Sequence, residues 1–225
     1  MKVVEIFQSI DGEVNHFSQG RISTFIRFAG CNLNCSYCDT LKAKNIEEGN
    51  YTEMTVEQIL TEIKNLGKTK ITLTGGEPLL QEEIFKLIDK LTNNISYNDN
   101  YDLSIETNGS IQIPPNQLIK KEISWIIDYK LEYEFEMIEK NWRYLTSKDW
   151  IKFPVRGIDE IQQAIKIKDE IKEFYREITV QFAISPINNN KIEKGEIEKL
   201  INYLISIKEF DFIVNLQLHK FINVR

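Results

Sequence analysis

Apolar, β-branched runs alternate with amphipathic helical patterns along this chain, and that alternation most constrains its fold. A strand, a helix and another strand in succession favour right-handed crossovers and a parallel sheet. The expected strands are 3–7, 24–28, 70–74, 102–106, 123–129, 150–153, 178–184 and 212–218, and the expected helices are 56–66, 81–91, 157–174 and 192–207. Only six or seven of these eight strands would belong to strand–helix repeats, which is too few for a closed eight-stranded barrel. We therefore expect an α/β fold, a partial, open (β/α)6-type TIM-like barrel with its chemistry at the carboxyl ends of the strands.

Composition favours one domain over residues 1–225. The chain is 42% hydrophobic and has 10 glycines and 5 prolines, without an internal repeat or a low-complexity tract. Residues 129–147 give a weak signal that leaves open a helix over 135–142 or an irregular excursion. No run approaches the ~18 apolar residues of a membrane span, and the start lacks the apolar core of a signal peptide, so we expect a cytoplasmic protein. With 34 acidic and 28 basic residues, the net charge of −6 argues against direct nucleic-acid binding.

All three cysteines fall within eight residues, at Cys31, Cys35 and Cys38. Thiolates are the ligands that iron-sulfur clusters and zinc prefer. Three of them would leave one iron of a [4Fe-4S] cluster without a protein ligand, open to a small molecule that carries an amine and a carboxylate. This spacing therefore favours a cluster that binds such a molecule.

Other interpretations of the cysteines fit less well. A Cys3His zinc site would need His16 or His219, and neither lies at the usual spacing. A disulfide is disfavoured because the cysteine count is odd and two gaps are short. Unliganded packing cysteines are not expected on a loop that continues into the polar residues Asp39 and Thr40.

The cysteine spacing, with an aromatic residue just before the last cysteine, resembles the radical S-adenosylmethionine (SAM) superfamily. The run Gly75-Gly76-Glu77-Pro78 after the strand 70–74 resembles the superfamily element that binds the amino group of SAM. Its glycines permit close backbone approach, and its carboxylate could bind an ammonium group. Taken alone, the run is an ordinary turn. Further resemblances place residues 106–109 near the ribose of SAM and residues 183–186 near its adenine.

The segments 4–13, 24–33, 38–40, 75–78, 106–109 and 216–220 together resemble the 7-carboxy-7-deazaguanine synthase family over nearly the whole chain. The resemblance implies conversion of 6-carboxy-5,6,7,8-tetrahydropterin into 7-carboxy-7-deazaguanine with loss of ammonia, a step toward 7-deazaguanine and queuosine. It implies a [4Fe-4S] cluster, SAM and Mg2+, with a 5'-deoxyadenosyl radical that abstracts hydrogen from C6 before the ring contracts. It also implies a homodimer and an electron donor of the flavodoxin or ferredoxin type.

The same resemblance assigns roles to individual residues. The hydroxyl of Thr40 is a hard oxygen suited to Mg2+, although Thr40 could instead cap a helix. Arg27 would bind the substrate carboxylate, or could be a surface arginine. Glu13 would accept hydrogen bonds from the guanidine-like ring edge, whereas His219 and Gln217 could equally be structural. The cluster ligands are Cys31, Cys35 and Cys38; the SAM-binding residues are Tyr37, Gly75, Gly76, Glu77, Glu106, Asn108 and Ser185; the substrate-binding residues are Ile10, Asp11, Gly12, Glu13, Arg27, Gln217 and His219.

The chain departs from the family pattern in two places. Where many relatives read Gln-Gly-Glu-Gly, residues 11–14 read Asp-Gly-Glu-Val, which replaces an amide by an acceptor. After residues 128–131, relatives tend to continue with Pro-Ser-Ser-Gly, but this chain continues with Glu132-Tyr133-Glu134. That element helps to hold the cofactor in relatives, so another group must replace it here or the affinity has changed.

Two competing hypotheses remain. A radical SAM activase, which generates a glycyl radical on a partner protein, shares the cysteine spacing and the Gly-Gly-Glu-Pro run. Segment 5–13 and the pair Asp39-Thr40 argue against it. A zinc-binding interaction module without catalysis would contain one zinc ion and no sulfide.

Overall fold

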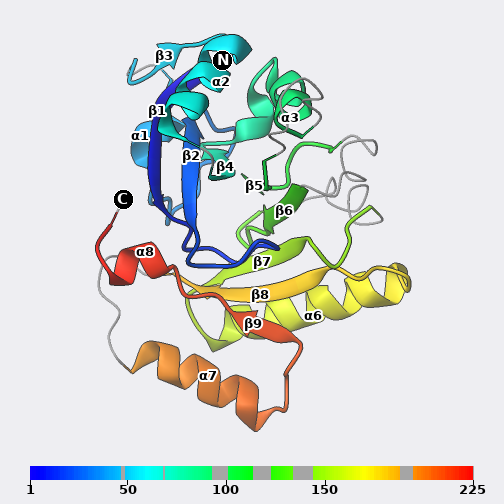
Figure 1. Cartoon of the computed structure of the whole chain (residues 1–225). Helices are drawn as coiled ribbons and strands as arrows, with labels where there is room; N and C mark the ends of the chain where they lie inside the picture. The colour runs from blue at the N-terminus through cyan, green and yellow to red at the C-terminus, as the bar shows by residue number, and fades with distance from the viewer. Residues whose placement is uncertain are drawn as a thin grey trace.

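The computed structural model describes residues 1–46, 49–67, 69–92, 101–113, 123–133, 144–187 and 195–224. In this part of the chain nine strands form one sheet in the order β3-β1-β2-β4-β5-β6-β7-β8-β9 (Figure 1). Strand β2 and strands β4 to β9 pair in parallel, and β1 pairs antiparallel with both β2 and β3. The strands are β1 (Lys2–Ile10), β2 (Ile22–Phe28), β3 (Thr52–Glu53), β4 (Lys70–Gly75), β5 (Leu103–Thr107), β6 (Ile123–Asp128), β7 (Trp150–Val155), β8 (Gln181–Pro186) and β9 (Phe212–Val214).

Helices follow most of the parallel strands. They are α1 (Leu41–Lys44), α2 (Val56–Leu66), the 3-10 turn η1 (Pro78–Leu80), α3 (Ile84–Thr92), α6 (Ile158–Phe174), α7 (Glu196–Ser206) and α8 (Leu218–Phe221). Helix α2 has the predicted bounds because Thr55 and Gln58 form a reciprocal capping box and Gly67 ends the helix. Its residues Val56, Ile59 and Ile63 are completely buried, as the helical spacing requires.

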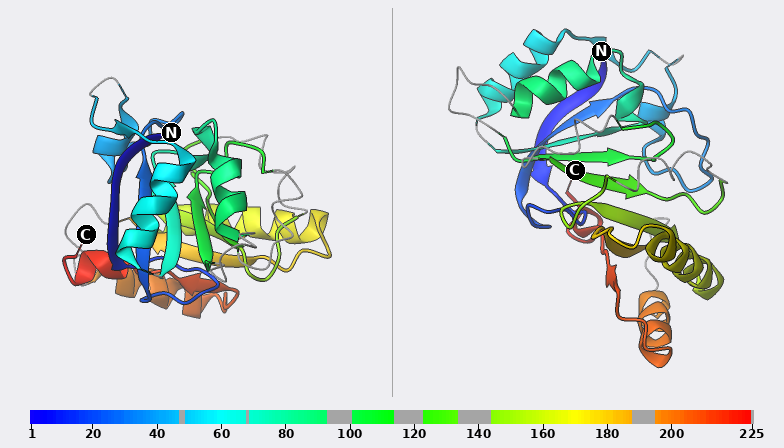
Figure 2. Two further views of the ribbon diagram at one scale, coloured as in Figure 1. Left: turned by 45° about the horizontal axis from the view of Figure 1, so that its top comes forward. Right: turned by 90° about the vertical axis from the view of Figure 1, so that its right-hand side faces the viewer.

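The alternation of side chains along each strand separates the apolar core from a polar interior. On β7, Ile151, Phe153 and Val155 join the main core that also contains residues of α2, α3 and α6. The intervening Lys152 and Pro154 point to the opposite, inner face and line a cavity. Figure 2 shows the sheet curving, with α2 and α3 beyond one end and α6 and α7 beyond the other. The curvature leaves the inner face free for a site.

The sheet has the predicted α/β architecture of an open, partial barrel, with β3 and β9 at its two edges. Several details differ from the prediction. The antiparallel direction of β1 was not anticipated, and neither β3 nor α1 was predicted, because each is too short for a periodic signal. The possible helix over 135–142 lies outside the described residues, as do residues 192–194 of the helix expected over 192–207.

The last expected strand, 212–218, was too long. Strand β9 ends at Val214, and α8 begins at Leu218. The chain leaves the sheet because the side chain of Asn215 donates to Glu13 and to Ser185, and the Leu218 N–H donates to the Gly12 carbonyl at 3.3 Å. His219 consequently lies on a short helix rather than at a strand end.

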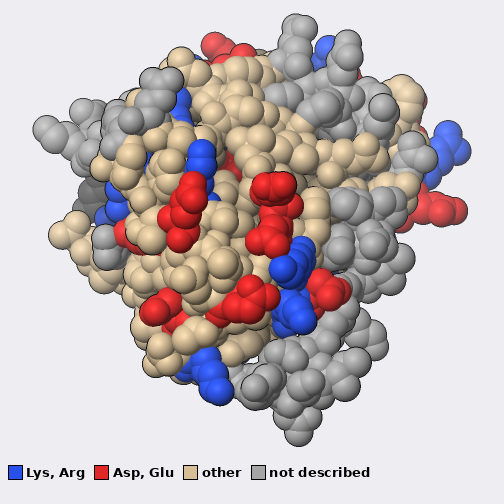
Figure 3. All heavy atoms as spheres, turned by 90° about the horizontal axis from the view of Figure 1, so that it is seen from above, with Lys and Arg blue, Asp and Glu red and all other residues tan. Residues whose placement is uncertain are grey.

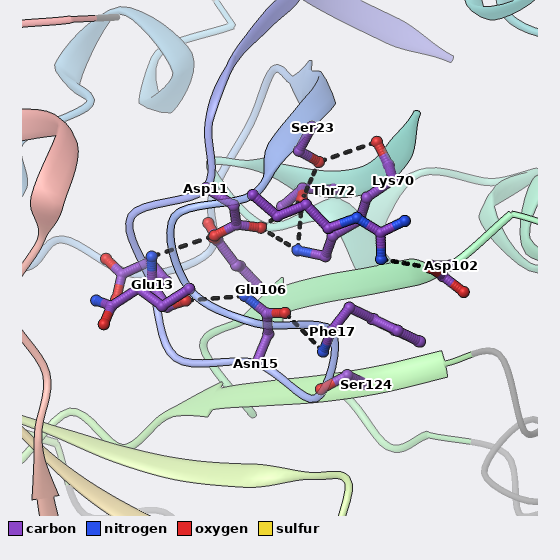
Figure 4. Close-up of polar contacts among 12 residues, drawn as sticks. Asp11, Glu13, Asn15, Phe17, Ser23, Lys70, Thr72, Asp102, Glu106 and Ser124 are labelled. Atoms are coloured by element: carbon purple, nitrogen blue, oxygen red, sulfur yellow. Dashed lines mark hydrogen bonds and ion pairs between the residues drawn. The ribbon is translucent and has the colours of Figure 1, made fainter. Parts of the chain in front are cut away.

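The loop between β1 and β2 closes the amino-terminal end of the barrel interior (Figure 4). Asp11 forms a buried ion pair with Lys70 of β4 and accepts a hydrogen bond from Thr72 at 2.8 Å. Farther along, the His16 N–H donates to the Ser124 hydroxyl of β6 at 3.1 Å. The loop therefore seals this end of the interior, and the cavity opens toward the carboxyl ends of the strands.

The outer surface carries charges of both signs. Seen from above the view of Figure 1, acidic and basic side chains lie next to each other (Figure 3). An exposed example is the ion pair between Glu83 and Lys86 at 2.9 Å. In the described part of the chain, no helix is long and apolar enough to cross a membrane.

Candidate active site

A cavity of about 220 Å3 lies at the carboxyl ends of the parallel strands. Consecutive strands each contribute inward-facing side chains near their last residues. In sheet order these residues are Arg27 of β2, Thr74 of β4, Glu106 of β5, Asp128 of β6, Lys152 of β7 and Ser185 of β8. This is the place where barrels of parallel strands carry their chemistry.

The cysteine loop covers one side of this cavity. Cys31, Cys35 and Cys38 are half-buried and unpaired, and all three line the cavity. Burial raises the pKa of the Cys31 thiol, and it raises the pKa of Cys35 to about 11. Among the described residues, no three His, Cys, Asp or Glu side chains already converge on one ion position. The three thiols therefore face one cavity, where a soft metal centre would bind them as thiolates.

Asn108 connects β5 to the cysteine loop. Its amide group donates to the Asn32 side chain at 3.1 Å and to the Cys31 sulfur at 3.7 Å. A hydrogen bond to a sulfur of this kind stabilises the thiolate form. Asn108, a predicted SAM-binding residue, lies on the cavity wall and contacts the cysteine loop directly.

Gly75 and Gly76 allow β4 to approach the cysteine loop. A Cβ atom at Gly76 would lie 2.1 Å from the Gly30 carbonyl oxygen, and one at Gly75 would lie 2.2 Å from the Phe28 oxygen. The Glu77 N–H also donates to the Gly30 carbonyl at 2.7 Å. Both glycines line the cavity. A larger residue at either position would collide with the backbone of residue 28 or 30 even without a bound ligand.

The structure does not place the Glu77 carboxylate in the cavity. Glu77 is completely buried and accepts hydrogen bonds from the Leu79 N–H, the Thr107 hydroxyl and the Asn108 N–H at 3.0, 2.8 and 2.7 Å. Burial raises its pKa to about 7. The side chain ties the end of β4 to the end of β5, so the prediction that it binds the amino group of SAM is not supported.

Glu13 lines the cavity, and three donors hold its carboxylate. One carboxylate oxygen accepts from Lys152 at 2.8 Å and from Asn215 at 2.5 Å, and the other accepts from Gln217 at 2.6 Å. Burial would raise the pKa of Glu13, but the ammonium group of Lys152 holds it below its ordinary value. Lys152 also pairs with Asp128 at 2.9 Å. Glu13 is therefore a preorganised anion.

Sequence reasoning missed Lys152. The residue lies on β7, is 4% exposed and faces the cavity between two carboxylates. These neighbours raise its pKa above the ordinary value although burial alone would lower it. Its sequence signal was a single lysine inside the otherwise apolar strand 150–153, which indicates a buried and paired charge.

Glu106 is a second carboxylate on the inner face. It accepts a hydrogen bond from the Thr74 hydroxyl at 2.7 Å. Loss of hydration, together with the nearby carboxylates of Glu13 and Asp11, raises its pKa to about 7. Glu106, a predicted SAM-binding residue, thus lies on the cavity wall near the other carboxylates.

Asp11 was predicted to bind the substrate, but the structure does not place its side chain among the residues that line the cavity. Its side chain is 1% exposed and points away from the cavity toward Lys70 and Thr72 (Figure 4). The neighbouring residues Ile10 and Gly12 do line the cavity. The acidic residue at position 11 therefore neutralises a buried lysine.

Arg27 and Thr40 lie near each other at the mouth of the cavity. The guanidinium of Arg27 donates to Glu5 at 2.9 Å, lies over the Phe7 ring and approaches the Thr40 hydroxyl at 3.5 Å. Thr40 precedes α1, but its side chain makes no capping hydrogen bond and instead donates to Asp39 at 3.1 Å. Thr40 thus occupies the N-cap position of α1 but leaves its hydroxyl free of a capping bond, and Arg27 is a half-buried residue of the cavity wall.

The C-terminal segment forms another wall. Gln217, His219 and Lys220 line the cavity, and Gly12 packs so closely that a Cβ atom there would lie 2.3 Å from the His219 Nδ1. Lys220 donates to Asp39 of the cysteine loop at 2.5 Å. Burial lowers the pKa of His219, which favours the neutral imidazole. The segment thereby joins the first and last parts of the chain around the cavity.

Tyr37 has features that suit a bound ligand. The cations of Lys130 and Arg156 lie over its ring at 5.6 and 5.1 Å. Its hydroxyl is buried and has no hydrogen-bond partner among the described residues. Ser185, the predicted adenine neighbour, also lines the cavity, with its hydroxyl accepting from Asn215 at 3.1 Å. The thiols, the orphaned hydroxyl and these polar walls fit an iron-sulfur centre with a polar small molecule beside it.

Comparisons with known proteins agree with this geometry. The sequence profile of the radical SAM superfamily matches residues 25–123. A 7-carboxy-7-deazaguanine synthase of Clostridium acetobutylicum is 39% identical over 98% of this chain and 95% of its own length. A second enzyme with this name, from Methanospirillum hungatei, is 32% identical over 100% of this chain and 86% of its own length.

A solved structure shares the fold. The crystal structure of QueE from Escherichia coli superposes with a TM-score of 0.70 at 20% identity, covering 95% of this chain and 92% of that one. The likeness in fold and the identity to two full-length relatives lead to one conclusion. The chain belongs to the 7-carboxy-7-deazaguanine synthase family of the radical SAM superfamily.

Proposed function

We propose that this protein converts 6-carboxy-5,6,7,8-tetrahydropterin into 7-carboxy-7-deazaguanine and ammonia, on the path to queuosine and related 7-deazaguanines. The names of the relatives support this reaction. The observation that carries the proposal is one cavity lined by the three cysteines and by Glu13 and Arg27. That cavity combines ligands for a cluster with an anion and a cation for a pterin carboxylic acid.

Family membership implies a [4Fe-4S] cluster and SAM. The residues present fit both, with Cys31, Cys35 and Cys38 as the thiol ligands and Tyr37 and Asn108 beside them. When bound, the cluster and SAM would supply the radical chemistry that removes a hydrogen atom from a carbon of the substrate. The protein binds and orients the reactants around that step.

Glu13 is suited to the guanidine-like edge of the pterin. A carboxylate offers about four acceptor positions, and the contacts from Lys152, Asn215 and Gln217 occupy three of them. Glu13 lines the cavity, and its carboxylate is already ionised and oriented there. Arg27, whose guanidinium lies beside Thr40, would bind the substrate carboxylate.

Thr40 is the proposed protein ligand of Mg2+. Its hydroxyl and the neighbouring Asp39 offer hard oxygen atoms near Arg27. Thr40→Ala should weaken the Mg2+ dependence of turnover and leave the iron content unchanged. An unaltered Mg2+ response would show that this assignment is wrong.

The assembly and location complete the proposal. We propose a cytoplasmic homodimer that receives electrons from a flavodoxin or ferredoxin type donor. Three large apolar side chains near the C-terminus, Ile205, Phe210 and Ile213, are exposed, which supports a protein contact in that region. Sedimentation analysis at micromolar concentration tests the dimer, and a purely monomeric protein would rule it out.

Anaerobic turnover tests the reaction. The reconstituted protein is mixed with dithionite, SAM, Mg2+ and 6-carboxytetrahydropterin, and the products are identified by mass spectrometry. Formation of 7-carboxy-7-deazaguanine supports the proposal. Appearance of 5'-deoxyadenosine without that product would refute the substrate assignment and favour the activase, whereas one zinc ion per chain without sulfide would favour the interaction module.

A further inference from the structure

Two residues that follow β6 bind the backbone of the cysteine loop. The carboxylate of Glu132 accepts hydrogen bonds from the Ser36 N–H at 3.1 Å and from the Ser36 hydroxyl at 2.9 Å. The phenolic oxygen of Tyr133 accepts one from the Asn34 N–H at 2.8 Å. The two anchored amides flank Cys35 on either side in sequence, so both bonds restrict the same thiol.

Arg156, which follows β7, reinforces these contacts. One guanidinium nitrogen donates to the Ser36 hydroxyl at 2.9 Å and lies 3.2 Å from the Glu132 carboxylate. The other lies 3.4 Å from Glu160 in the first turn of α6, and the group as a whole lies over the Tyr37 ring. The loop is thus tied to a rigid helix and to the ends of two strands.

These contacts occupy the stretch in which the sequence departs from the family pattern and to which the resemblance assigned no role. An acidic residue and a tyrosine are present there in place of a Pro-Ser-Ser-Gly run. Since three cysteines on one loop must reach one centre, any freedom of the loop costs conformational entropy when the centre binds. Fixing the loop beforehand reduces that cost.

We propose that Glu132, Tyr133 and Arg156 form a clamp that positions the cysteine loop, and Cys35 above all, for cluster binding. The inference rests on the proposed function, in which this loop holds the cluster. The three side chains are positioning residues: Glu132 binds Ser36, Tyr133 binds the Asn34 N–H and also contacts the Cys35 thiol, and Arg156 contacts Ser36 and the Tyr37 ring.

The first test uses the metal-free protein, so that it measures the mobility of the cysteine loop without a bound cluster. Cysteine alkylation by N-ethylmaleimide is followed residue by residue with mass spectrometry under anaerobic, reduced conditions. Loss of hydrogen bonds to a charged acceptor should make Cys35 react about tenfold faster in Glu132→Ala. Tyr133→Phe, which removes a single oxygen atom, should give about a threefold increase. Rates within twofold of the wild type for both variants would overturn the proposal.

Two further variants separate the clamp from other effects. Glu132→Gln keeps an acceptor for the Ser36 N–H but removes the charge near Cys35, so it should react more slowly than Glu132→Ala. Equal acceleration in the two variants would show an effect of charge on the thiol and would refute the clamp. Glu83→Gln is the control. It removes the carboxylate of the exposed ion pair with Lys86, which at 2.9 Å is similar in length to the Arg156–Glu132 pair but far from the cysteine loop in sequence, and it should leave the alkylation rate unchanged.

The second test concerns the loaded protein. After reconstitution, loss of the cluster absorbance is followed during challenge with EDTA. Glu132→Ala should lose iron several times faster than the wild type, with Glu83→Gln as the control. Equal rates of loss in all three proteins would contradict the clamp. If the wild type binds no cluster, the proposed function fails, while the alkylation rates still decide whether the clamp holds the loop.

Discussion

Lys152→Met removes the cation that lies between two carboxylates in the cavity wall. The Lys152 nitrogen is 2.8 Å from Glu13 and 2.9 Å from Asp128, and the residue is 4% exposed. At an effective dielectric constant of ~20, each contact is worth about 6 kcal/mol of Coulomb attraction, most of which offsets the loss of hydration. Removing Lys152 leaves the buried Glu13 carboxylate without a cation, whereas Asp128 keeps its ion pair with Lys130 at 2.8 Å. We therefore expect the free energy of unfolding to fall by about 3 kcal/mol at pH 8.

The loss should depend on pH with a definite sign. In the wild type the pKa of Glu13 lies below its ordinary value. Ionised Glu13 therefore stabilises the folded protein at pH values above the ordinary pKa, and this contribution is lost as the pH falls through the lowered pKa. Without Lys152, burial should raise the pKa of Glu13, so the folded variant takes up a proton in mildly acidic solution. The difference between the two proteins should therefore shrink by on the order of 1 to 2 kcal/mol between pH 8 and pH 5.

Urea unfolding of the metal-free proteins, followed by tryptophan fluorescence at both pH values, measures this difference. Lys168→Met is a matched control because Lys168 is also buried and lies 2.7 Å from Glu209, but on α6 outside the cavity. It should lose similar stability and keep the KM for the pterin, whereas Lys152→Met should raise that KM. A loss below about 1 kcal/mol for Lys152→Met, or an equal loss at pH 5 and pH 8, would refute the reasoning.

Three other substitutions follow from the same structure. Glu106→Gln should raise the free energy of unfolding by on the order of 2 kcal/mol at pH 8 and change it little at pH 5. The reason is that a pKa raised to about 7 means that ionised Glu106 destabilises the folded protein at pH 8, whereas at pH 5 the group is already protonated. A difference in urea titrations that is the same at both pH values would contradict this. Gly76→Ala should cost about 3 kcal/mol because its Cβ would meet the Gly30 oxygen at 2.1 Å, whereas Gly157→Ala, with open space around it, should change the thermal midpoint little. Cys35→Ala should abolish cluster binding and cleavage of SAM, and iron and sulfide analysis of a variant that still binds four irons would reject the ligand assignment.

Local sequence patterns predicted much of the fold because they record short-range requirements. The helix 56–66 was predicted correctly because its cap, its apolar spacing and its terminal glycine all lie within a dozen residues. The strand 70–74 was predicted because Ile71 and Leu73 alternate with threonines and the pair Gly75-Gly76 follows them. By contrast, the antiparallel direction of β1 depends on pairing with β2 and leaves no trace in its own residues.

The site was partly predictable for the same reason. Cys31, Cys35 and Cys38 carry their signal in their spacing, and all three line the cavity. The roles of Asp11 and Glu77 could not be derived locally, because each depends on partners far along the chain. Lys70 neutralises Asp11 across 59 residues, and the Thr107 hydroxyl and Asn108 N–H bind Glu77 across 30 and 31 residues.

The sequence by itself determined the class of fold, the cysteine motif and the resemblance to one enzyme family. Each of these follows from residue types at short spacing, which local backbone geometry and ligand chemistry constrain directly. Only the tertiary structure decided which acidic residues face the cavity, because strand register sets the direction of every side chain. It also brought Lys152, Asn215 and Gln217 to Glu13, and Glu132 to Ser36, since these contacts join segments that meet only when the sheet curves around its polar interior.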